Sequence, residues 1–93
     1  MIKSFASPFT FRIFQREFVR QLPHDIQRVA LRKLLMLHAA TNLTDLRIPP
    51  ANRLEPLRGS RRDQHSIRIN DQWRICFAWK DGAAYDVEII DYH

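Results

Sequence analysis

The last three residues of the chain, Asp91, Tyr92 and His93, combine side chains that can exchange protons, stack on a base and form hydrogen bonds. A histidine titrates near neutral pH, so His93 can carry a proton under physiological conditions. An aspartate can act as a base or orient a neighbour, and a tyrosine ring can stack on a nucleobase. A strand that ends in these residue types can equally be a solvated terminus without a chemical role.

Arg58 and Arg74 supply the cationic groups that this C-terminal triplet would need in order to act on a phosphodiester. Cleavage of RNA without a metal requires a base for the ribose 2′-hydroxyl, a cation beside the phosphorus oxygens and an acid for the departing 5′-oxygen. The planar guanidinium of arginine can contact two phosphate oxygens at once. The triplet and the two arginines therefore contain the residue types that all three tasks require.

The histidines and the single cysteine do not predict a metal centre. No HExxH or CxxC spacing occurs, whereas a zinc site needs three or four converging ligands. The four histidines are His24, His38, His65 and His93. We therefore expect no metal and no other cofactor. Cys76 cannot form an internal disulfide, which fits a reducing cytosol, and we expect it to be a small buried strand residue.

Three runs of alternating apolar and polar residues are expected to form the sheet that positions these groups. Residues 65–70, 73–79 and 85–93 have the two-residue period of strands, and the Asp-Gly pair at 81–82 predicts a hairpin turn. One face of the middle run carries Trp73, Ile75, Phe77 and Trp79, and the other carries Arg74, Cys76 and Ala78. We predict an antiparallel meander with one apolar face that must be covered.

Two amphipathic helices are predicted to cover this apolar face. The first would begin at Ser7-Pro8, where a capping hydroxyl precedes a proline, and continue to Leu22. The second would have Asp25 as its N-cap and run to about Ala40, so that the two helices meet at Pro23. A helical hairpin on one face of a small antiparallel sheet is an α+β fold.

The remaining segments are expected to be short or irregular. Residues 2–5 and 53–58 are candidate edge strands, and residues 44–48 a candidate helical turn. The two prolines within residues 48–52 exclude a helix or a central strand there. Residues 59–64 are expected to form a polar, basic loop.

The composition indicates one domain, residues 1–93, since a chain of 93 residues with 45% hydrophobic residues can bury one modest core. Uncharged apolar runs such as residues 34–37 are far shorter than the roughly 20 residues of a membrane-spanning helix. The first residues lack the apolar region of a signal peptide. We therefore expect no membrane association and a cytoplasmic location.

The charge favours nucleic acid as a partner. The formal net charge is +5, and twelve of the 15 cationic residues are arginines, whose planar forks suit phosphate oxygens. An arginine-rich surface can also serve solvation or contact with a protein. The bias is strongest between residues 53 and 74, and we assign RNA binding to Arg53, Arg61, Arg62 and Arg68.

Four stretches together resemble the HigB-type toxins of the RelE superfamily. They are Leu57-Arg58-Gly59, His65-Ser66-Ile67-Arg68-Ile69-Asn70, Gln72-Trp73-Arg74-Ile75-Cys76-Phe77 and the closing Asp91-Tyr92-His93. The opening Met1-Ile2-Lys3-Ser4-Phe5 is also similar, so the resemblance spans nearly the whole chain. It implies a RelE-like fold and the toxin half of a type II toxin–antitoxin pair.

The resemblance also implies an activity and partners. The expected activity is ribosome-dependent, metal-independent endonucleolytic cleavage of mRNA by attack of the 2′-hydroxyl on the adjacent phosphate, which inhibits translation. The expected partners are the ribosome, mRNA and a neutralising HigA-type helix-turn-helix antitoxin, with operator DNA contacted only through the antitoxin. The alternative classes are a non-catalytic RNA- or ribosome-binding module and a structural partner that only holds an antitoxin.

By position, the resemblance implies catalytic roles for the C-terminal triplet and for Arg58 and Arg74. Arg58 stands where such toxins often have lysine, which keeps the cation but changes its shape. Glu55 stands where some members have a catalytic histidine, and a carboxylate cannot bring positive charge to the scissile phosphate. Glu55 remains a possible general base, or a local partner of Arg53 or Arg58. Arg74 can contact phosphate, or pair structurally with Asp91 or Glu88.

Overall fold

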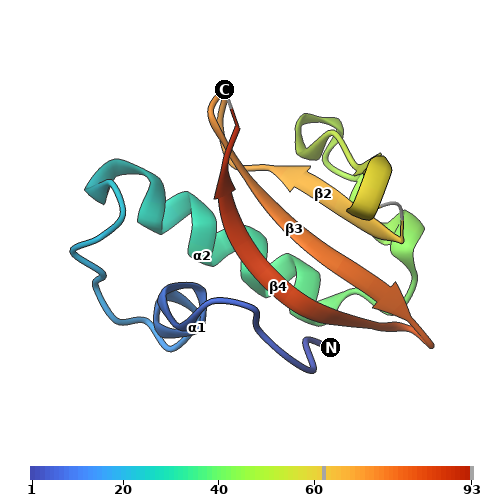
Figure 1. Cartoon of the computed structure of the whole chain (residues 1–93), viewed down its shortest axis with the longest axis horizontal. Coiled ribbons are helices and arrows are strands. Elements are labelled where there is room, and N and C mark those ends of the chain that lie inside the picture. The colour runs from blue at the N-terminus through green and yellow to red at the C-terminus, as the bar shows by residue number, and fades with distance from the viewer. Residues whose placement is uncertain (62, 93) are drawn as a thin grey trace.

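The computed structural model describes residues 1–61 and 63–92 and shows a four-stranded antiparallel sheet with helices on one face. The strands follow the chain order β1-β2-β3-β4 and are β1 (Glu55–Pro56), β2 (Gln64–Arg68), β3 (Trp73–Lys80) and β4 (Ala83–Asp91). The longer helix, α2 (His24–Ala39), crosses behind the sheet, and α1 (Pro8–Phe14) lies beside β4 (Figure 1). This arrangement confirms the predicted α+β fold class.

The three longer strands form the predicted meander. The β2–β3 turn is held by the Asn70 side-chain oxygen, which accepts from the backbone N–H groups of Gln72 and Trp73, both at 2.8 Å. In the β3–β4 turn, Asp81 and Gly82 have φ values of 52° and 75°, as a tight hairpin turn with Asp-Gly requires. The end of β4 lies beside the β2–β3 turn (Figure 1).

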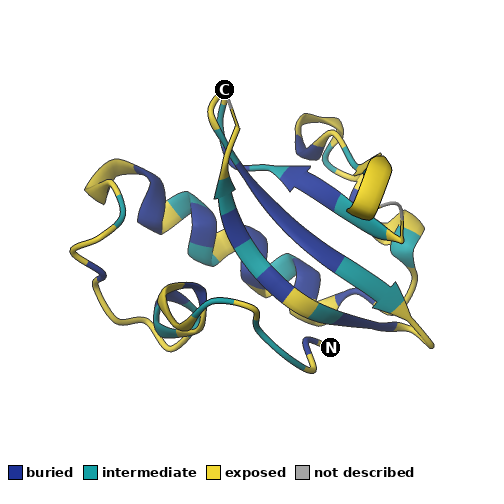
Figure 2. Cartoon of the chain, viewed as in Figure 1, coloured by how far each residue is buried: buried dark blue, intermediate teal, exposed yellow. Residues whose placement is uncertain are grey.

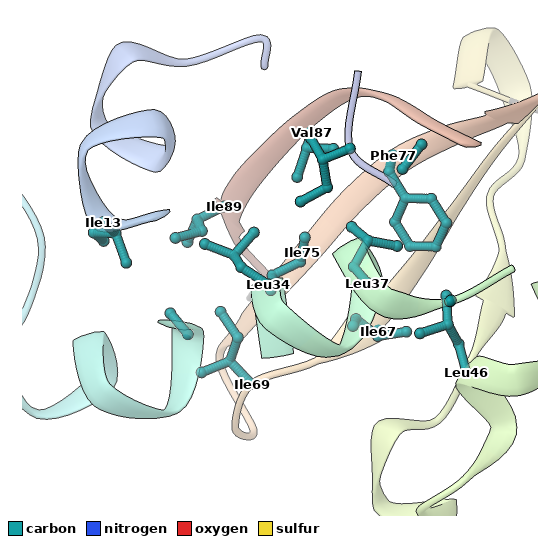
Figure 3. Close-up of a cluster of buried hydrophobic side chains, with 14 of the residues drawn as sticks. Ile13, Leu34, Leu37, Leu46, Ile67, Ile69, Ile75, Phe77, Val87 and Ile89 are labelled. Carbon is teal, nitrogen blue, oxygen red and sulfur yellow. The ribbon is translucent and has the colours of Figure 1, made fainter. Parts of the chain in front are cut away.

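The sheet face that packs against α2 carries the apolar residues that the alternation predicts. The buried contributors from the strands are Ile67, Ile75, Phe77, Val87 and Ile89, and they meet Leu34 and Leu37 of α2 and Ile13 of α1 (Figure 3). Trp73 and Trp79 are half-buried and pack against this core. Figure 2 shows the matching pattern on α2, where buried and exposed residues alternate along the helix.

Helix α1 is shorter than predicted. Its start is as expected, because the Ser7 hydroxyl accepts from the backbone N–H groups of Phe9 (3.2 Å) and Thr10 (3.5 Å). The helix ends at Phe14, and residues 15–23 form no regular element. Val19 explains the difference. It is fully buried, and the Gln27 side chain of α2 both accepts from its N–H (3.0 Å) and donates to its carbonyl (2.6 Å).

The predicted N-cap of the second helix was also wrong. Helix α2 begins at His24 with Pro23 as the N-cap, and no side-chain hydrogen bond caps it. Asp25 lies in the first turn instead, where a carboxylate interacts favourably with the helix dipole. The helix ends at Ala39, next to the predicted end. Among the described residues, no helix combines the length and apolar character needed to cross a bilayer.

The short segments follow the predictions with one exception. The expected helical turn is the 3₁₀ helix η1 (Leu43–Arg47), and β1 is an edge strand paired with β2. The exception is the 3₁₀ helix η2 (Pro50–Asn52), in a segment expected to lack helix. A proline at the first position of a helix loses no hydrogen bond, because its missing N–H would have no partner there. The basic loop contains the 3₁₀ helix η3 (Gly59–Arg61).

The N-terminal residues lie along the free edge of β4. Ile2 and Phe5 form isolated parallel bridges with Ala84 and Val87, so this predicted edge strand is reduced to two bridges. The Ile2 N–H also donates to Nδ1 of His38 on α2, at 3.1 Å. The helices pack on one face of the sheet and the N-terminal residues lie along the β4 edge. Neither helix packs on the opposite face of the sheet.

Candidate active site on the outer face of the sheet

A row of polar side chains crosses the sheet on the face opposite α2, which we call the outer face. The strand register pairs Glu55 with Ser66, Ser66 with Cys76, and Cys76 with Glu88. Residues directly opposite one another on neighbouring strands project to the same side of a sheet. One row therefore contains Glu55, Ser66, Cys76 and Glu88, one residue from each strand.

Arg74 lies beside this row and is 9% exposed. Its Nε donates to the Ser66 hydroxyl at 2.8 Å, and its Nη2 donates to the Arg53 carbonyl at 2.6 Å. These partners replace the predicted structural pairing with Asp91 or Glu88. The guanidinium has five N–H groups, and the hydrogen bonds to the described residues use Nε and Nη2. The remaining nitrogen, Nη1, is the one through which Arg74 can contact a phosphate.

Tyr92 follows β4 and places its ring over the same part of the outer face. Its backbone N–H donates to the Gln72 carbonyl at 2.6 Å. Its hydroxyl lies 3.9 Å from the Cys76 sulfur, and its ring centroid is 6.0 Å from the central guanidinium carbon of Arg74. With 39% of its surface exposed, the ring has apolar area left for stacking on a base.

The thiol and the phenol of this pair are both held in their protonated forms. Burial raises the pKa of the Cys76 thiol above its usual range, and the Tyr92 hydroxyl acts in the opposite direction as a smaller effect. Burial likewise raises the pKa of Tyr92, with the neighbouring Cys76 as a second cause. Because only a thiolate is a strong nucleophile, the buried Cys76 thiol is a packing residue and not a candidate nucleophile.

Two further arginines line the outer face and are paired with acids. An Arg61 nitrogen (Nη2) on η3 lies 3.4 Å from a carboxylate oxygen of Glu88. Arg68 lies opposite Arg74 in the register, and its Nη2 is 2.6 Å from a carboxylate oxygen of Asp71. The hydrogen bond from Arg68 lowers the pKa of Asp71. Both pairs are exposed enough to exchange the acid for a phosphate at modest cost.

The structure brings together most, but not all, of the predicted site residues. Those on or bordering the outer face are Glu55, Arg53, Arg61, Arg68, Arg74 and Tyr92. Arg58 is exposed and lies between β1 and η3. The predicted residues His93 and Arg62 lie outside the described residues.

Asp91 is the predicted catalytic residue that the structure does not place on the outer face. It pairs in the register with Trp73, which packs against the core on the helix side. The side-chain amide of Gln72 donates to both Asp91 carboxylate oxygens, at 3.1 and 3.2 Å. Gln72 therefore contacts both Asp91 and the backbone of Tyr92, so the Asp91 carboxylate helps to fix the end of β4.

Sequence reasoning missed the roles of Ser66 and Glu88. Both occupy outward positions of strands that the alternation predicted, but nothing local in the sequence shows which side chain lies opposite them. Ser66 is fully buried and supports Arg74, and Glu88 receives Arg61 from a loop 27 residues away. The strand register supplies this information, and register depends on contacts between distant segments.

The cavity in the helical layer and the metal-binding residue types were compared with the outer-face site. A cavity of about 470 Å³ lies in the helical layer, between α1, the following connection and the start of α2. None of the predicted site residues lines it. In the part of the chain that the structure describes, no three His, Cys, Asp or Glu side chains are grouped so that they could hold a metal ion.

Comparison with known families gives the outer face a context. Residues 3–93 match the family model described as the RelE-like toxin of the type II toxin–antitoxin system HigB. The chain belongs to this HigB-like toxin family. The match includes every strand of the sheet and every predicted site residue, so the HigB-like assignment applies to the whole outer face.

Similar proteins agree with the HigB-like assignment. Toxin HigB-1 of Vibrio cholerae is 48% identical over 74 residues, which are 80% of this chain and 77% of that protein. Endoribonuclease HigB of Proteus vulgaris is 33% identical over 94 residues and covers the full length of both chains. The crystal structure of a YafQ mutant from E. coli superposes with a TM-score of 0.60 at 13% identity, covering 98% of this chain and 93% of that one. The structural match confirms the RelE-like fold.

Proposed function

We propose that this HigB-like toxin is an endoribonuclease that cuts mRNA on the ribosome and thereby inhibits translation. The full-length relative from Proteus vulgaris carries the name of an endoribonuclease. The observation that carries the proposal for this chain is the outer face itself. There, the buried guanidinium of Arg74, whose Nη1 has no hydrogen bond to the described residues, lies 6.0 Å from the partly exposed ring of Tyr92. The guanidinium can bind a phosphate, and the tyrosine ring can stack on the base of the same nucleotide.

In the proposed reaction, the ribose 2′-oxygen attacks the adjacent phosphorus and the bond to the departing 5′-oxygen breaks. Negative charge grows on the phosphorus oxygens, and Nη1 of Arg74 is placed to receive it. Arg61 borders the same face, Arg58 lies in the connection just before η3, and both would add positive charge from this segment. Donors that are fixed before the reaction stabilise this charge without reorganisation, which is the largest single effect in many enzymes. Tyr92 would hold the base by stacking.

Two residues are proposed to move the protons. Glu55 lies opposite Ser66 on the outer face, and as a carboxylate it can accept the proton of the 2′-hydroxyl. His93 follows Tyr92 in the chain and can protonate the departing 5′-oxygen, because an imidazole titrates near neutral pH. Asp91 acts indirectly in this scheme, through Gln72 and the end of β4. No step in the scheme requires a metal ion.

Type II toxins act together with an antitoxin, and we propose a HigA-type helix-turn-helix protein as the partner of this one. The complex would contact operator DNA through the antitoxin, and the free toxin would act in the cytoplasm, where ribosomes and mRNA are found. The net charge of +5 favours association with ribosomal RNA and mRNA, because cationic side chains release the counterions of phosphates on binding.

Expression of the toxin without an antitoxin tests the proposal. The expected result is growth arrest with new transcript 5′ ends inside coding regions, and neither effect with Arg74→Ala. The matched control is Arg32→Ala, which removes an exposed arginine from α2 and is expected to leave the new ends in place. Arrest with intact transcripts would contradict the proposal in favour of a non-catalytic ribosome-binding module, and the absence of arrest would favour a purely structural partner.

A further inference from the structure

We infer that Lys33 and Asn52, which lie on the helical side of the sheet, are positioning residues for the guanidinium of Arg74 on the outer face. The inference rests on the proposed function for its test by cleavage activity. The positioning of Arg74 can also be tested without that activity. The two residues belong to α2 and η2, and neither borders the outer-face row. Their effect on Arg74 passes through the backbone of Arg53.

The first step is a buried contact between α2 and η2. Lys33 is 4% exposed, and its Nζ donates to the side-chain oxygen of Asn52, which is fully buried. Burial lowers the pKa of Lys33, and the charges of Arg32 and Arg68 lower it further. Burying an ammonium group is costly unless it has a partner. The Asn52 oxygen supplies that partner, so the position of one residue depends on the other.

The second step fixes the segment around Asn52. Its side-chain amide nitrogen donates to the backbone carbonyls of Leu46 at 3.1 Å and of Ile48 at 3.5 Å. Asn52 thus contacts Lys33 of α2 through its oxygen and the η1–η2 segment through its nitrogen, which also lies 3.9 Å from the Met36 sulfur of α2. A buried side chain with both ends hydrogen-bonded has little freedom to move, because each lost bond would leave an unsatisfied buried group.

The third step carries this constraint to the outer face. Arg53, the next residue, has φ 45° and ψ 60°, a left-handed conformation that non-glycine residues adopt only when their surroundings hold them. Its N–H donates to the Pro50 carbonyl at 3.0 Å. In this conformation its own carbonyl accepts from Nη2 of Arg74 at 2.6 Å. A shift of Asn52 would therefore turn the carbonyl that Arg74 depends on.

The Arg53 carbonyl matters because it is one of two fixed points for the Arg74 guanidinium. The other is Ser66, whose hydroxyl accepts from Nε at 2.8 Å and whose backbone carbonyl accepts from Nη2 at the longer distance of 3.4 Å. Two contacts on different nitrogens set the plane of the group, and the plane sets the direction of Nη1. Without the Arg53 carbonyl, Nη2 would keep only its longer, 3.4 Å hydrogen bond to the Ser66 backbone carbonyl, and the guanidinium would be held less firmly. Misplacement of a catalytic group by about 1 Å can reduce a rate by roughly 100-fold.

A matched pair of α2 variants tests the positioning directly. Lys33→Met removes the bond to Asn52, whereas Gln27→Met removes the contacts of another buried polar side chain of the same helix, which holds the backbone of Val19 and Leu22. Proton exchange of the Arg74 Nε–H group is followed by NMR. We expect it to accelerate about 10-fold in Lys33→Met, as for loss of roughly 1.4 kcal/mol of protection, and to stay unchanged in Gln27→Met. Unchanged exchange in a folded Lys33→Met variant would overturn the inference.

A second variant covers the case in which Lys33→Met does not fold. Asn52→Asp keeps an acceptor for Lys33 but loses the amide donor to the Leu46 and Ile48 carbonyls. Faster Arg74 exchange in this variant would support the second and third steps. Exchange equal to that of the wild type would show that the η1–η2 segment does not control Arg74.

Cleavage assays on translating ribosomes separate positioning from general destabilisation. Lys33→Met is expected to reduce the cleavage rate roughly 10- to 100-fold, and Gln27→Met to leave it near the wild-type value. In an Arg74→Ala background, Lys33→Met should reduce the residual rate by less than about 2-fold, because residues that act through one group are not additive. A full additional loss would overturn the inference. A wild-type protein that does not cleave would refute the proposed function, while the exchange measurement would still decide the positioning.

Discussion

Arg74 is the residue on which the proposed chemistry of the outer face depends. It is an arginine in a position where a lysine would carry the same charge, but the structure uses its shape. The planar group reaches Ser66 with one nitrogen and the Arg53 carbonyl with another, and it still has Nη1 for a ligand. A lysine ammonium is a single point charge on a flexible stem and cannot hold three partners in this geometry.

Replacement of Arg74 by lysine is therefore expected to reduce cleavage about 100- to 1,000-fold, the usual effect of losing one preoriented donor to developing charge. The rate of transcript cleavage on ribosomes measures the effect. Arg32→Lys on α2 is the matched control and should retain the wild-type rate. Wild-type cleavage by Arg74→Lys would show that charge alone is sufficient and that the two protein contacts have no catalytic purpose.

His65 is a second residue whose environment has a measurable consequence. It lies opposite Phe77 in the sheet, and its Nδ1 is buried without a hydrogen-bond partner among the described residues. Burial lowers its pKa below the ordinary value of 6.5. The unfolded chain consequently takes up a proton at this position before the folded protein does, and the stability that depends on neutral His65 is lost as pH falls below 6.5.

We expect the free energy of unfolding of the wild type to fall more steeply between about pH 7.5 and about pH 5 than that of His65→Phe. The phenylalanine keeps an aromatic ring against Phe77 but cannot be protonated. Urea unfolding at several pH values measures the difference. Parallel pH profiles for the two proteins would show that His65 titrates alike in the folded and unfolded states.

At the scale of elements, the strands were predictable and the end of the first helix was not. Strand residues alternate with a period of two, and the Asp-Gly turn is a local signal, so the three main strands and the apolar face of β3 could be predicted. The predicted helix through residues 15–22 was wrong because of a distant contact: the Gln27 side chain satisfies the backbone of Val19. Apolar spacing alone contains no information about such a contact.

The same distinction applies to the candidate site. The presence of arginines and of the C-terminal triplet could be predicted, as could Arg74 on the face opposite Ile75. The partners of Arg74 could not, since one of them is a backbone carbonyl 21 residues away. The side of the sheet on which Asp91 lies depends on its pairing with Trp73. This pairing cannot be derived from the sequence.

Substitutions in β3 are expected to reduce the free energy of unfolding by amounts that follow the burial of each side chain. Phe77 is fully buried between the sheet and α2, whereas Trp79 is half-buried. Phe77→Ala should therefore reduce the free energy of unfolding by about 3–5 kcal/mol, as large aromatic truncations in cores do, and Trp79→Ala by clearly less. Denaturant unfolding measures both values. A larger loss for Trp79→Ala would mean that the centre of the core lies elsewhere.

At the scale of the whole molecule, the helical layer and the outer face differ in composition. The helices and the inner sheet face form the core, and the outer face is left with the arginines of the β1–β2 segment and of β2 and β3. With a net charge of +5, the proposed binding to ribosomes would be sensitive to salt, because each neutralised phosphate releases counterions.

This division predicts which arginines determine the salt dependence. Arg68→Gln should reduce the slope of log affinity for ribosomes against log salt concentration by about 1, the value for one lost phosphate contact. Arg32→Gln on α2 makes the same change of charge in the helical layer and should leave the slope unchanged. Affinities at several salt concentrations give both slopes. The reverse result, with only Arg32→Gln lowering the slope, would place the RNA contacts on the helices.

The most direct test of the proposed site is a structure of the wild-type toxin on a translating ribosome. The mRNA would carry a 2′-O-methyl group at the cut site, which blocks attack on the phosphate. The proposed mechanism places the blocked linkage on the outer face, with a phosphate oxygen within hydrogen-bonding distance of Arg74 and the neighbouring base stacked on Tyr92. An mRNA strand bound instead against α1 and α2, with the outer face turned away from it, would contradict an active site on the outer face.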